Sequence, residues 1–322
     1  MEESRVVGGM DKFAVPVTGV NTGKYSVIAD PETAELDQAY LQYRNGGFKL
    51  KAGRQVLTHD GHRFLGHVGW RQDRQSFDGL TVDYATNNNS NFTYSFFNQR
   101  NRIFAEEADL ASKDHIFKGS VATRFGNLTG YSYLLEVDNQ TDNSLDTYGM
   151  SLIGKTAGDA GVSYTLEYAT QSSVSGMNGY DTDYLMAEAG ISRAGVKYKL
   201  TYEAMGSDGG NFGFSTPLAT LHKFNGWADT FLRTPDQGLA DIAVTAAGKI
   251  GAGKWTVSYH DFRAADSTPG VRDFGSELDL LYTRPLSDRF LIGLKYARYS
   301  AGDSVTGKVD TDKLWVWTNF RF

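Results

Sequence analysis

Basic side chains gather in one stretch near the start of the sequence and continue into the next loop. Guanidinium groups bind carboxylates through two parallel hydrogen bonds, and rings of arginine and lysine are how pores select anions. The stretch therefore predicts a constriction lined by Arg and Lys that passes anionic solutes, acidic sugars among them. The long loop 56–75, with its apolar Phe64, Leu65, Val68 and Trp70, could fold into a pore to form it. The alternative is that these charges are solvated loop residues, or that they pair with Asp60, Asp73 and Asp78. The basic residues are Arg44, Lys49, Lys51, Arg54, Arg63, Arg71, Arg74, Arg100 and Arg102.

A second stretch of interest is the long segment Asp208–Gln237, which carries several aromatic residues. A connection of this length is uncommon unless it has a function of its own. Aromatic rings can stack on the faces of sugars, so Phe214, Phe224 and Trp227 are candidates for contact with a saccharide. The alternative is that the rings only hold the loop in place.

Four residues, His59, Asp60, His62 and His67, lie close enough in sequence to raise the question of a metal site. Their spacing matches no strong metal signature and has no helix context, so we expect no bound metal. The sequence contains no Cys, which excludes disulfides and thiolate sites. It also has no Gly-x-Ser-x-Gly elbow and no phosphate-loop pattern, so we expect neither an enzyme nor a cofactor.

Strands must position these residues, because hydrophobic periodicity of two recurs from Glu35 to the end of the chain. The pattern predicts about fifteen strands, and each cleaner one has an apolar-aromatic side and a polar or small side. The last segment, 312–322, shows this alternation and ends on Phe322. We expect the apolar sides to include Tyr131, Tyr133 and Leu135, as well as Leu314 and Val316. The polar sides of later strands add Lys199, Glu203 and Lys295 as candidate lining residues.

The connections between these strands alternate between short and long. Asn45–Gly47 is followed by the long Val56–Gln75, and Arg193–Gly195 by the very long Gly206–Gly238. Transmembrane barrels have short periplasmic turns and long outer loops. The pattern therefore predicts an all-β fold, an antiparallel transmembrane β-barrel with the polar sides in its lumen. The alternative is a soluble all-β protein, but an open sheet of about fifteen strands would tend to curl or split.

Composition agrees with a barrel. Aromatic residues make up 13% of the chain, Gly outnumbers Pro by 36 to 6, and the mean hydropathy is −0.39. No apolar run reaches the roughly 18 residues of a transmembrane helix. The net charge of −6 argues against a nucleic-acid partner.

Closure of the barrel makes a further prediction. The final strand and the strand at 35–44 run in the same direction, whereas single-chain bacterial barrels have an even number of antiparallel strands. We therefore expect an odd number of further strands before Glu35, of which at most one could lie within 1–34. Residues 1–5 show no signal peptide, which also indicates a truncated start. We expect one barrel domain over 1–322, with a loop-like start at 1–34 that includes a weak strand candidate at 24–28.

Several segments resemble the alginate-export family of outer-membrane porins, from about residue 28 to Phe322. The resemblance implies a barrel of about eighteen strands, which agrees with fifteen strands here and three missing. The matching segments are 35–43 (ELDQAYLQY), 51–55 (KAGRQ), 68–78 (VGWRQDRQSFD), 147–149 (TYG), 168–171 (YATQ), 214–229 (FSTPLATLHKFNGWAD) and 259–262 (YHDF).

The expected function is a passive outer-membrane channel for small anionic or sugar-like solutes, with alginate or uronate as the implied class. Outer-membrane lipid is an expected partner, and so is the barrel assembly machinery, which reads an aromatic carboxy-terminus such as Phe322. The alternatives are a structural or adhesive barrel that does not conduct, and a barrel-embedded hydrolase. The sequence does not indicate the oligomeric state.

Overall fold

The computed structural model describes residues 2–7, 13–15, 21, 27–28, 30–86, 89–104, 106–138, 143–156, 161–173 and 179–322. Its main feature is a 15-stranded antiparallel sheet whose strands follow one another in sequence order. The fold class and the number of strands predicted for it are confirmed. The strands are β3 (Ala39–Asn45), β4 (Phe48–Gln55), β5 (Ser76–Ala85), β6 (Ser90–Asn101), β7 (Leu110–Thr123), β8 (Gly126–Val137), β9 (Asn143–Lys155), β10 (Ser163–Ser173), β11 (Asp181–Arg193), β12 (Val196–Met205), β13 (Leu239–Ile250), β14 (Gly253–Thr268), β15 (Val271–Pro285), β16 (Phe290–Ala301) and β17 (Thr311–Phe320).

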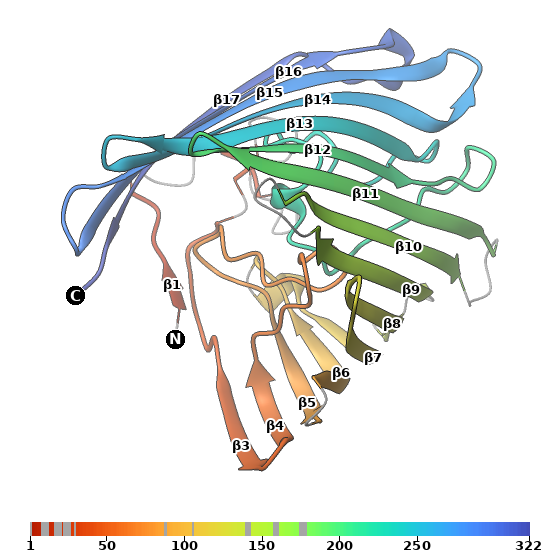
Figure 1. The fold of residues 1–322 in the computed structure, drawn as a ribbon, viewed down its shortest axis with the longest axis vertical. Coiled ribbons are helices and arrows are strands. Elements are labelled where there is room, and N and C mark those ends of the chain that lie inside the picture. The colour runs from red at the N-terminus through yellow and green to blue at the C-terminus, as the bar shows by residue number, and fades with distance from the viewer. Residues whose placement is uncertain are drawn as a thin grey trace.

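The sheet curls into an incomplete barrel that surrounds its own long loops (Figure 1). β3 and β17 are the outermost strands, and the described residues show no pairing between them. A separate two-stranded sheet joins β1 (Glu2–Ser4) to β2 (Thr33–Glu35), and Figure 1 shows β1 beside the opening between the two edges. The weak strand candidate at 24–28 lies outside the described residues except for 27 and 28, where Val27 forms an isolated bridge to Ala14.

The two sides of the wall differ as the alternating pattern predicts. In β17, Leu314 and Val316 are 64% and 73% exposed, whereas Trp315 packs against a residue of an inward-folded loop, His222. The other strands carry similar rows of exposed Leu, Val, Tyr and Phe on their outer side. Such continuous apolar rows are unusual on a surface that meets water, and in a transmembrane barrel they form the belt that meets lipid.

Strand β8 contradicts the prediction that its apolar residues face outward. Tyr131, Tyr133 and Leu135 are 7%, 2% and 5% exposed and point into the lumen. The reason is tertiary packing, because Phe64 of the first long loop lies against the rings of Tyr131 and Tyr133, at centroid distances of 5.1 and 5.5 Å. Period-two alternation places side chains on two faces but does not say which face meets lipid.

The ends of the barrel differ as expected, with one exception. Two-residue turns join β7 to β8 and β11 to β12 at one end. At the other end, the segment 263–273 is an extension of the β14–β15 hairpin rather than a long loop, with register shifts near Arg263 and a tight turn at Gly270, whose φ is +82°. Pro269 and Gly270 are typical turn residues, so both strands continue to this point.

Loop 56–75 and loop 206–238 fold back against the inner wall, where most of the buried apolar residues gather. Phe64, Leu65, Phe214 and Phe231 come from these loops, and strand residues such as Tyr184 complete the cluster. The core of the molecule therefore lies inside the barrel, toward the end with the long loops. Within the described part of the chain, no helix is long and apolar enough to cross a membrane.

Candidate functional site: the lumen and its inward loops

The two inward loops are joined to each other by backbone hydrogen bonds. The N–H of Gly66 donates to the carbonyl of Leu218 at 2.8 Å, and the N–H of Thr220 donates to the carbonyl of His62 at 3.1 Å. The buried Gln75 side chain donates to the carbonyl of Gly66 at 2.7 Å and to that of Leu218 at 3.2 Å. The loops thus form one layer across the lumen, although they are far apart in sequence.

Arg63 is the central contact of this layer. Its Nε lies 2.9 Å from a carboxylate oxygen of Glu203 on β12, and its Nη2 donates to the side-chain oxygen of Asn225 at 3.0 Å. The guanidinium also lies 4.6 Å from the centroid of the Phe224 ring. Arg63 is 5% exposed and Glu203 is 6% exposed. A buried ion pair of this kind fixes geometry, because losing either partner would leave a buried charge unpaired.

Lys295 on β16 makes a second connection between both loops and the wall. Its Nζ lies 2.9 Å from Nε2 of His222, whose Nδ1 lies 2.6 Å from a carboxylate oxygen of Asp229. The Nζ is also 3.6 Å from the centroid of the Trp70 ring, and Trp70 stacks on His222. Burial lowers the pKa of His222. A neutral ring is consistent with these contacts, because Nδ1–H can donate to Asp229 while Nε2 accepts from Lys295. We call Lys295, His222, Asp229 and Trp70 the Lys295 clamp.

Most other predicted cations have acidic partners. Arg54 and Arg100 each form two hydrogen bonds to one aspartate, and Arg54 is the penultimate residue of β4, as its position on the outward parity required. The ion pairs are Arg54–Asp78, Arg71–Asp30, Arg71–Asp229, Arg74–Asp37, Arg74–Glu2, Arg100–Asp114 and Lys199–Glu188. The charges of these residues are therefore largely balanced where they lie.

Arg102 is held by uncharged groups. Its guanidinium donates to the side-chain oxygen of Gln75 and, at 3.3 Å, to the carbonyl of Pro217. Burial lowers the pKa of Arg102 to about 10. Arg102 thus ties the layer of loops to the connection that follows β6.

A group of cations on the inner face of β3 and β4 is less balanced. Arg44 lies opposite Lys49, and Lys51 lies opposite Gln42, one step further along. Lys49 pairs with Asp83 at 2.5 Å, and the Nζ of Lys51 lies over the Tyr40 ring at 4.3 Å. Among the described residues, neither Arg44 nor Lys51 has an acidic partner within ion-pair distance. We call Arg44, Lys49 and Lys51 the wall patch; it lies near the end of the barrel with the short turns.

A cavity of about 540 Å³ lies between the layer of loops and the wall. Binding sites for small molecules commonly have this size. Hydroxyl groups from several strands line it, and Thr245 and Ser258 are hydrogen-bonded to each other at 2.8 Å. Lys223 also lines it, with Nζ donating to the carbonyl of Gly61 at 2.7 Å. The other lining residues used below are Ser151, Thr165, Glu167, Lys199, Thr201, Phe224, Trp227 and Asp241.

The three predicted loop aromatics differ in position. Phe214 is fully buried, and its ring packs against Phe64 and Tyr184 at centroid distances of 6.0 and 5.5 Å. Phe224 and Trp227 line the cavity and lie beside the cations Arg63 and Lys295, respectively. Phe214 is therefore a packing residue, whereas the other two lie where a solute in the cavity can reach them.

The histidine-rich segment shows no metal-binding geometry. His62 and His67 pack ring against ring at 5.3 Å, and His59 lies 3.3 Å from the hydroxyl of Tyr133. Burial, and then the charge of Lys118, lowers the pKa of His59 to about 4. In the part of the chain that the structure describes, no group of three His, Cys, Asp or Glu residues is arranged to hold a metal.

Sequence reasoning placed Trp70 in a loop that could fold into the pore, but it missed His222 and Asp229 as residues that hold the loops. It also missed Lys223 and the wall hydroxyls as lining. His222, Lys223 and Asp229 lie within the segment 214–229, which carried the family resemblance, so that segment contained a usable signal. The hydroxyl residues could be recognised in the sequence because they occupy the alternate, polar positions of the predicted strands. Their convergence on one cavity depends on how the sheet curls.

Comparison with known proteins agrees with this architecture. The model of the alginate export family matches residues 20–204. The outer membrane protein OpdK of Pseudomonas aeruginosa has a TM-score of 0.71 at 13% identity, over 87% of this chain and 78% of its own. OccAB4 of Acinetobacter baumannii gives 0.69 at 12% identity, over 87% and 73%. OccD3 (OpdP) of P. aeruginosa gives 0.68 at 13% identity, over 89% and 78%. No curated protein matched.

At these identities the solved structures show the fold alone, and it is that of outer-membrane barrels. The family match covers more than half of the chain. This chain belongs to the alginate-export family and is a porin-like β-barrel of the bacterial outer membrane.

Proposed function

We propose that this protein is a passive channel for small anionic or sugar-like solutes, with uronates related to alginate as the solute class. The observation that carries the proposal is the layer of two inward loops over a polar cavity of about 540 Å³. In this proposal the layer, held by hydrogen bonds and buried ion pairs, narrows the lumen and leaves a path beside it. A solute must then pass along the hydroxyl-lined wall.

In this proposal, the selectivity for anions depends on cations whose charge is not neutralised by an acidic partner. Arg44 and Lys51 of the wall patch have no acidic partner among the described residues, and Lys223 reaches the cavity. We propose that these three, rather than the paired Arg54, Arg74 and Arg100, form the basic path for an anion. The charge of Arg71 is shared between Asp30 and Asp229 at 3.5 and 3.8 Å, so it contributes more weakly.

The preference for sugar-like solutes rests on the cavity lining. Hydroxyls of Ser151, Thr165 and Thr201 offer hydrogen bonds, and the rings of Phe224 and Trp227 offer apolar faces. Among the solved relatives by fold, one structure is of OpdK with vanillate, a small carboxylate. This supports a lumen of this architecture as a path for small organic anions.

The test is conductance in planar bilayers with the full chain. In a potassium chloride gradient, the sign of the reversal potential gives the preferred ion, and we expect chloride. Adding galacturonate or short uronate oligomers should reduce the open current more than neutral sugars of equal size do. A barrel that inserts and does not conduct would contradict the channel. Conduction with a preference for potassium would contradict only the anion path.

The paired arginines offer a sharper test of the path. If Arg71 and Arg74 formed the selective element, Arg71→Ala with Arg74→Ala would abolish the anion preference. We expect the preference to survive this double change and to fall with Arg44→Ala and Lys51→Ala. The opposite result would place the selective element in loop 56–75.

A further inference from the structure

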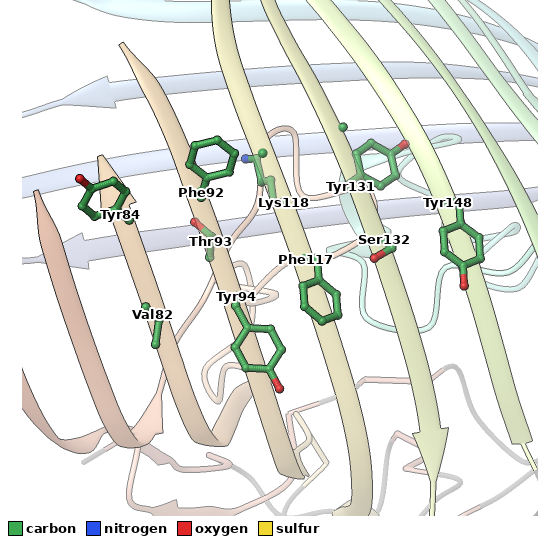
Figure 2. Close-up of a pocket in the computed structure, with 12 residues that line it drawn as sticks. Val82, Tyr84, Phe92, Thr93, Tyr94, Phe117, Lys118, Tyr131, Ser132 and Tyr148 are labelled. Atoms are coloured by element: carbon green, nitrogen blue, oxygen red, sulfur yellow. The ribbon is translucent and has the colours of Figure 1, made fainter. Parts of the chain in front are cut away.

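The outer face of the wall carries a groove that the channel function does not use. It lies over β5 to β9 and has a volume of about 530 Å³. Figure 2 shows the rings of Phe92, Phe117 and Tyr148 on separate strands around it. These side chains are 55%, 47% and 52% exposed and have the parity that faces lipid.

Two glycines on neighbouring strands deepen the groove. Gly119 of β7 and Gly130 of β8 are direct cross-strand partners, and Phe92 lies opposite Gly119 on the other side. Neither glycine has a positive φ. A Cβ at Gly130 would meet no atom within 4 Å, so backbone geometry does not require glycine there. The missing side chains instead leave a hollow between aromatic walls.

The groove presents no charge to the membrane. Lys118 contributes to its floor, but its Nζ turns to the lumen and binds Asp60 at 2.6 Å. Tyr94 packs beside Phe117 at a centroid distance of 4.8 Å, and its hydroxyl bonds to His115 at 2.9 Å. A void of this kind in hydrocarbon forfeits dispersion contacts along its whole lining, so a flexible apolar chain gains by filling it.

The position of the groove identifies the membrane leaflet. From the pair Gly119–Gly130 the hairpin continues through Val121–Leu128 to the two-residue turn of Arg124 and Phe125. At about 3.3 Å per residue, the turn lies roughly 16 Å from the glycines. Short turns lie on the periplasmic side. The exposed guanidinium of Arg124 lies 4.5 Å from the centroid of the Phe125 ring at this turn.

We propose that this groove is a binding site for one phospholipid of the periplasmic leaflet. One acyl chain lies between Phe92, Phe117 and Tyr148 over the two glycines, and the phosphate binds Arg124. The site continues the lipid-facing belt, and the exposed guanidinium of Arg124, at the end of the hairpin with the short turn, complements a phosphate. A second barrel is a less suitable occupant, because a narrow groove fits one flexible chain better than a convex wall.

The experiment uses the full chain in vesicles that contain phosphatidylglycerol with a diazirine at the middle of one acyl chain. After illumination, labelled peptides are mapped by mass spectrometry. We expect label on residues 117–132 to exceed label on the lipid-facing residues of β13 by about threefold, which corresponds to under 1 kcal/mol of preference. Equal labelling of the two walls, or crosslinks between copies in place of lipid, would overturn the proposal.

Matched variants make the test specific. Gly130→Leu fills the groove and should lower the label on 117–132 to the level of β13. Ala189→Leu adds the same bulk to the outer face of β11 and should change nothing. Arg124→Glu should lower the enrichment by removing the phosphate contact. Folding of each variant is judged by heat-modifiable gel mobility. If Gly130→Leu does not fold, Ser132→Leu takes its place, because it fills the groove from the next outward-facing position of β8. Unchanged label in a folded groove-filling variant would contradict the site.

Discussion

Two buried cations, Arg63 of a loop and Lys295 of β16, carry the same charge as the wall patch but differ in what surrounds that charge. Arg63 and Lys295 are each 5% exposed, and acidic or aromatic groups contact their charged ends. Arg44 is exposed and, in the described part of the chain, has no acidic partner. We propose that burial and pairing separate two roles for basic residues in this barrel: buried, paired cations hold the loops, and exposed, unpaired ones contact the solute.

The largest effect is expected from Arg63→Ala. The change would leave Glu203 buried without its cation and remove a contact to Asn225, so we expect a loss of about 3–5 kcal/mol in the free energy of unfolding. Urea titration followed by tryptophan fluorescence would measure it. Arg233→Ala, an exposed arginine in the second inward loop, is the control and should cost less than about 0.5 kcal/mol. Similar losses in both variants would show that pairing does not explain the effect.

Lys295→Met tests the Lys295 clamp. It keeps the length of the side chain but removes the hydrogen bond to His222 and the cation–π contact with Trp70, so we expect a loss of about 2 kcal/mol. The released loops should also make the single-channel current noisier. Lys254→Met changes an exposed strand lysine and should have no effect on either measurement. If the Lys295→Met protein had normal stability and a quiet current, this would contradict the claim that the Lys295 clamp holds the loops.

Asp73 is an acidic group in the same layer. Among the described residues it has no ion-pair partner, whereas Arg63 pairs with Glu203. Asp73 is 4% exposed, and one of its carboxylate oxygens has no hydrogen-bond partner. Burial, and then the carboxylates of Glu35 and Glu2, raises the pKa of Asp73 to about 7. Protonation therefore favours the folded protein, and this contribution is lost as pH rises from about 4 to about 7.

We expect Asp73→Asn to stabilise the protein at pH 8 by on the order of 1 kcal/mol, after allowance for solvent screening, and to have little effect near pH 4. Urea titrations at the two pH values would show the difference. A variant that is less stable than the parent at pH 8 would indicate that the ionised carboxylate has a partner.

The wall patch should show the opposite behaviour to the buried cations. We expect Arg44→Ala with Lys51→Ala to change stability by less than about 0.5 kcal/mol and to lower the ratio of chloride to potassium permeability about twofold. The selectivity should also weaken at high salt, because exposed charges are screened. A large loss of stability with unchanged selectivity would reverse the assignment of roles.

The sequence was sufficient for the number of strands and for the possibility that loop 56–75 folds inward, but it did not predict the contacts that the loops make. Alternation in β17 predicted the exposed Leu314 and Val316 correctly, because a lipid-facing side must be apolar along its length. The same rule failed for Tyr131 and Tyr133, since apolar residues also face inward where a loop packs on them. Whether an apolar side faces lipid or a packed loop depends on how distant segments contact each other in the fold.

The ion pairs and contacts within the site could not be predicted from the sequence for a similar reason. Arg63 and Glu203 are separated by about 140 residues, and no local pattern links them. Lys295, His222 and Trp70 come from three distant segments that meet only after the sheet has curled. The sequence indicated which cations exist, but the tertiary fold decides which of them remain available to a solute.

The most direct test of the account is thiol accessibility at two adjacent residues of β13. The chain contains no Cys, so single cysteines can be introduced without background. Thr245 lines the cavity, and Val244 is 54% exposed on the outer face. In planar bilayers, an anionic, membrane-impermeant thiosulfonate should reduce the current of Thr245→Cys and leave that of Val244→Cys unchanged. Block of Val244→Cys with no effect on Thr245→Cys would contradict the assignment of the two faces.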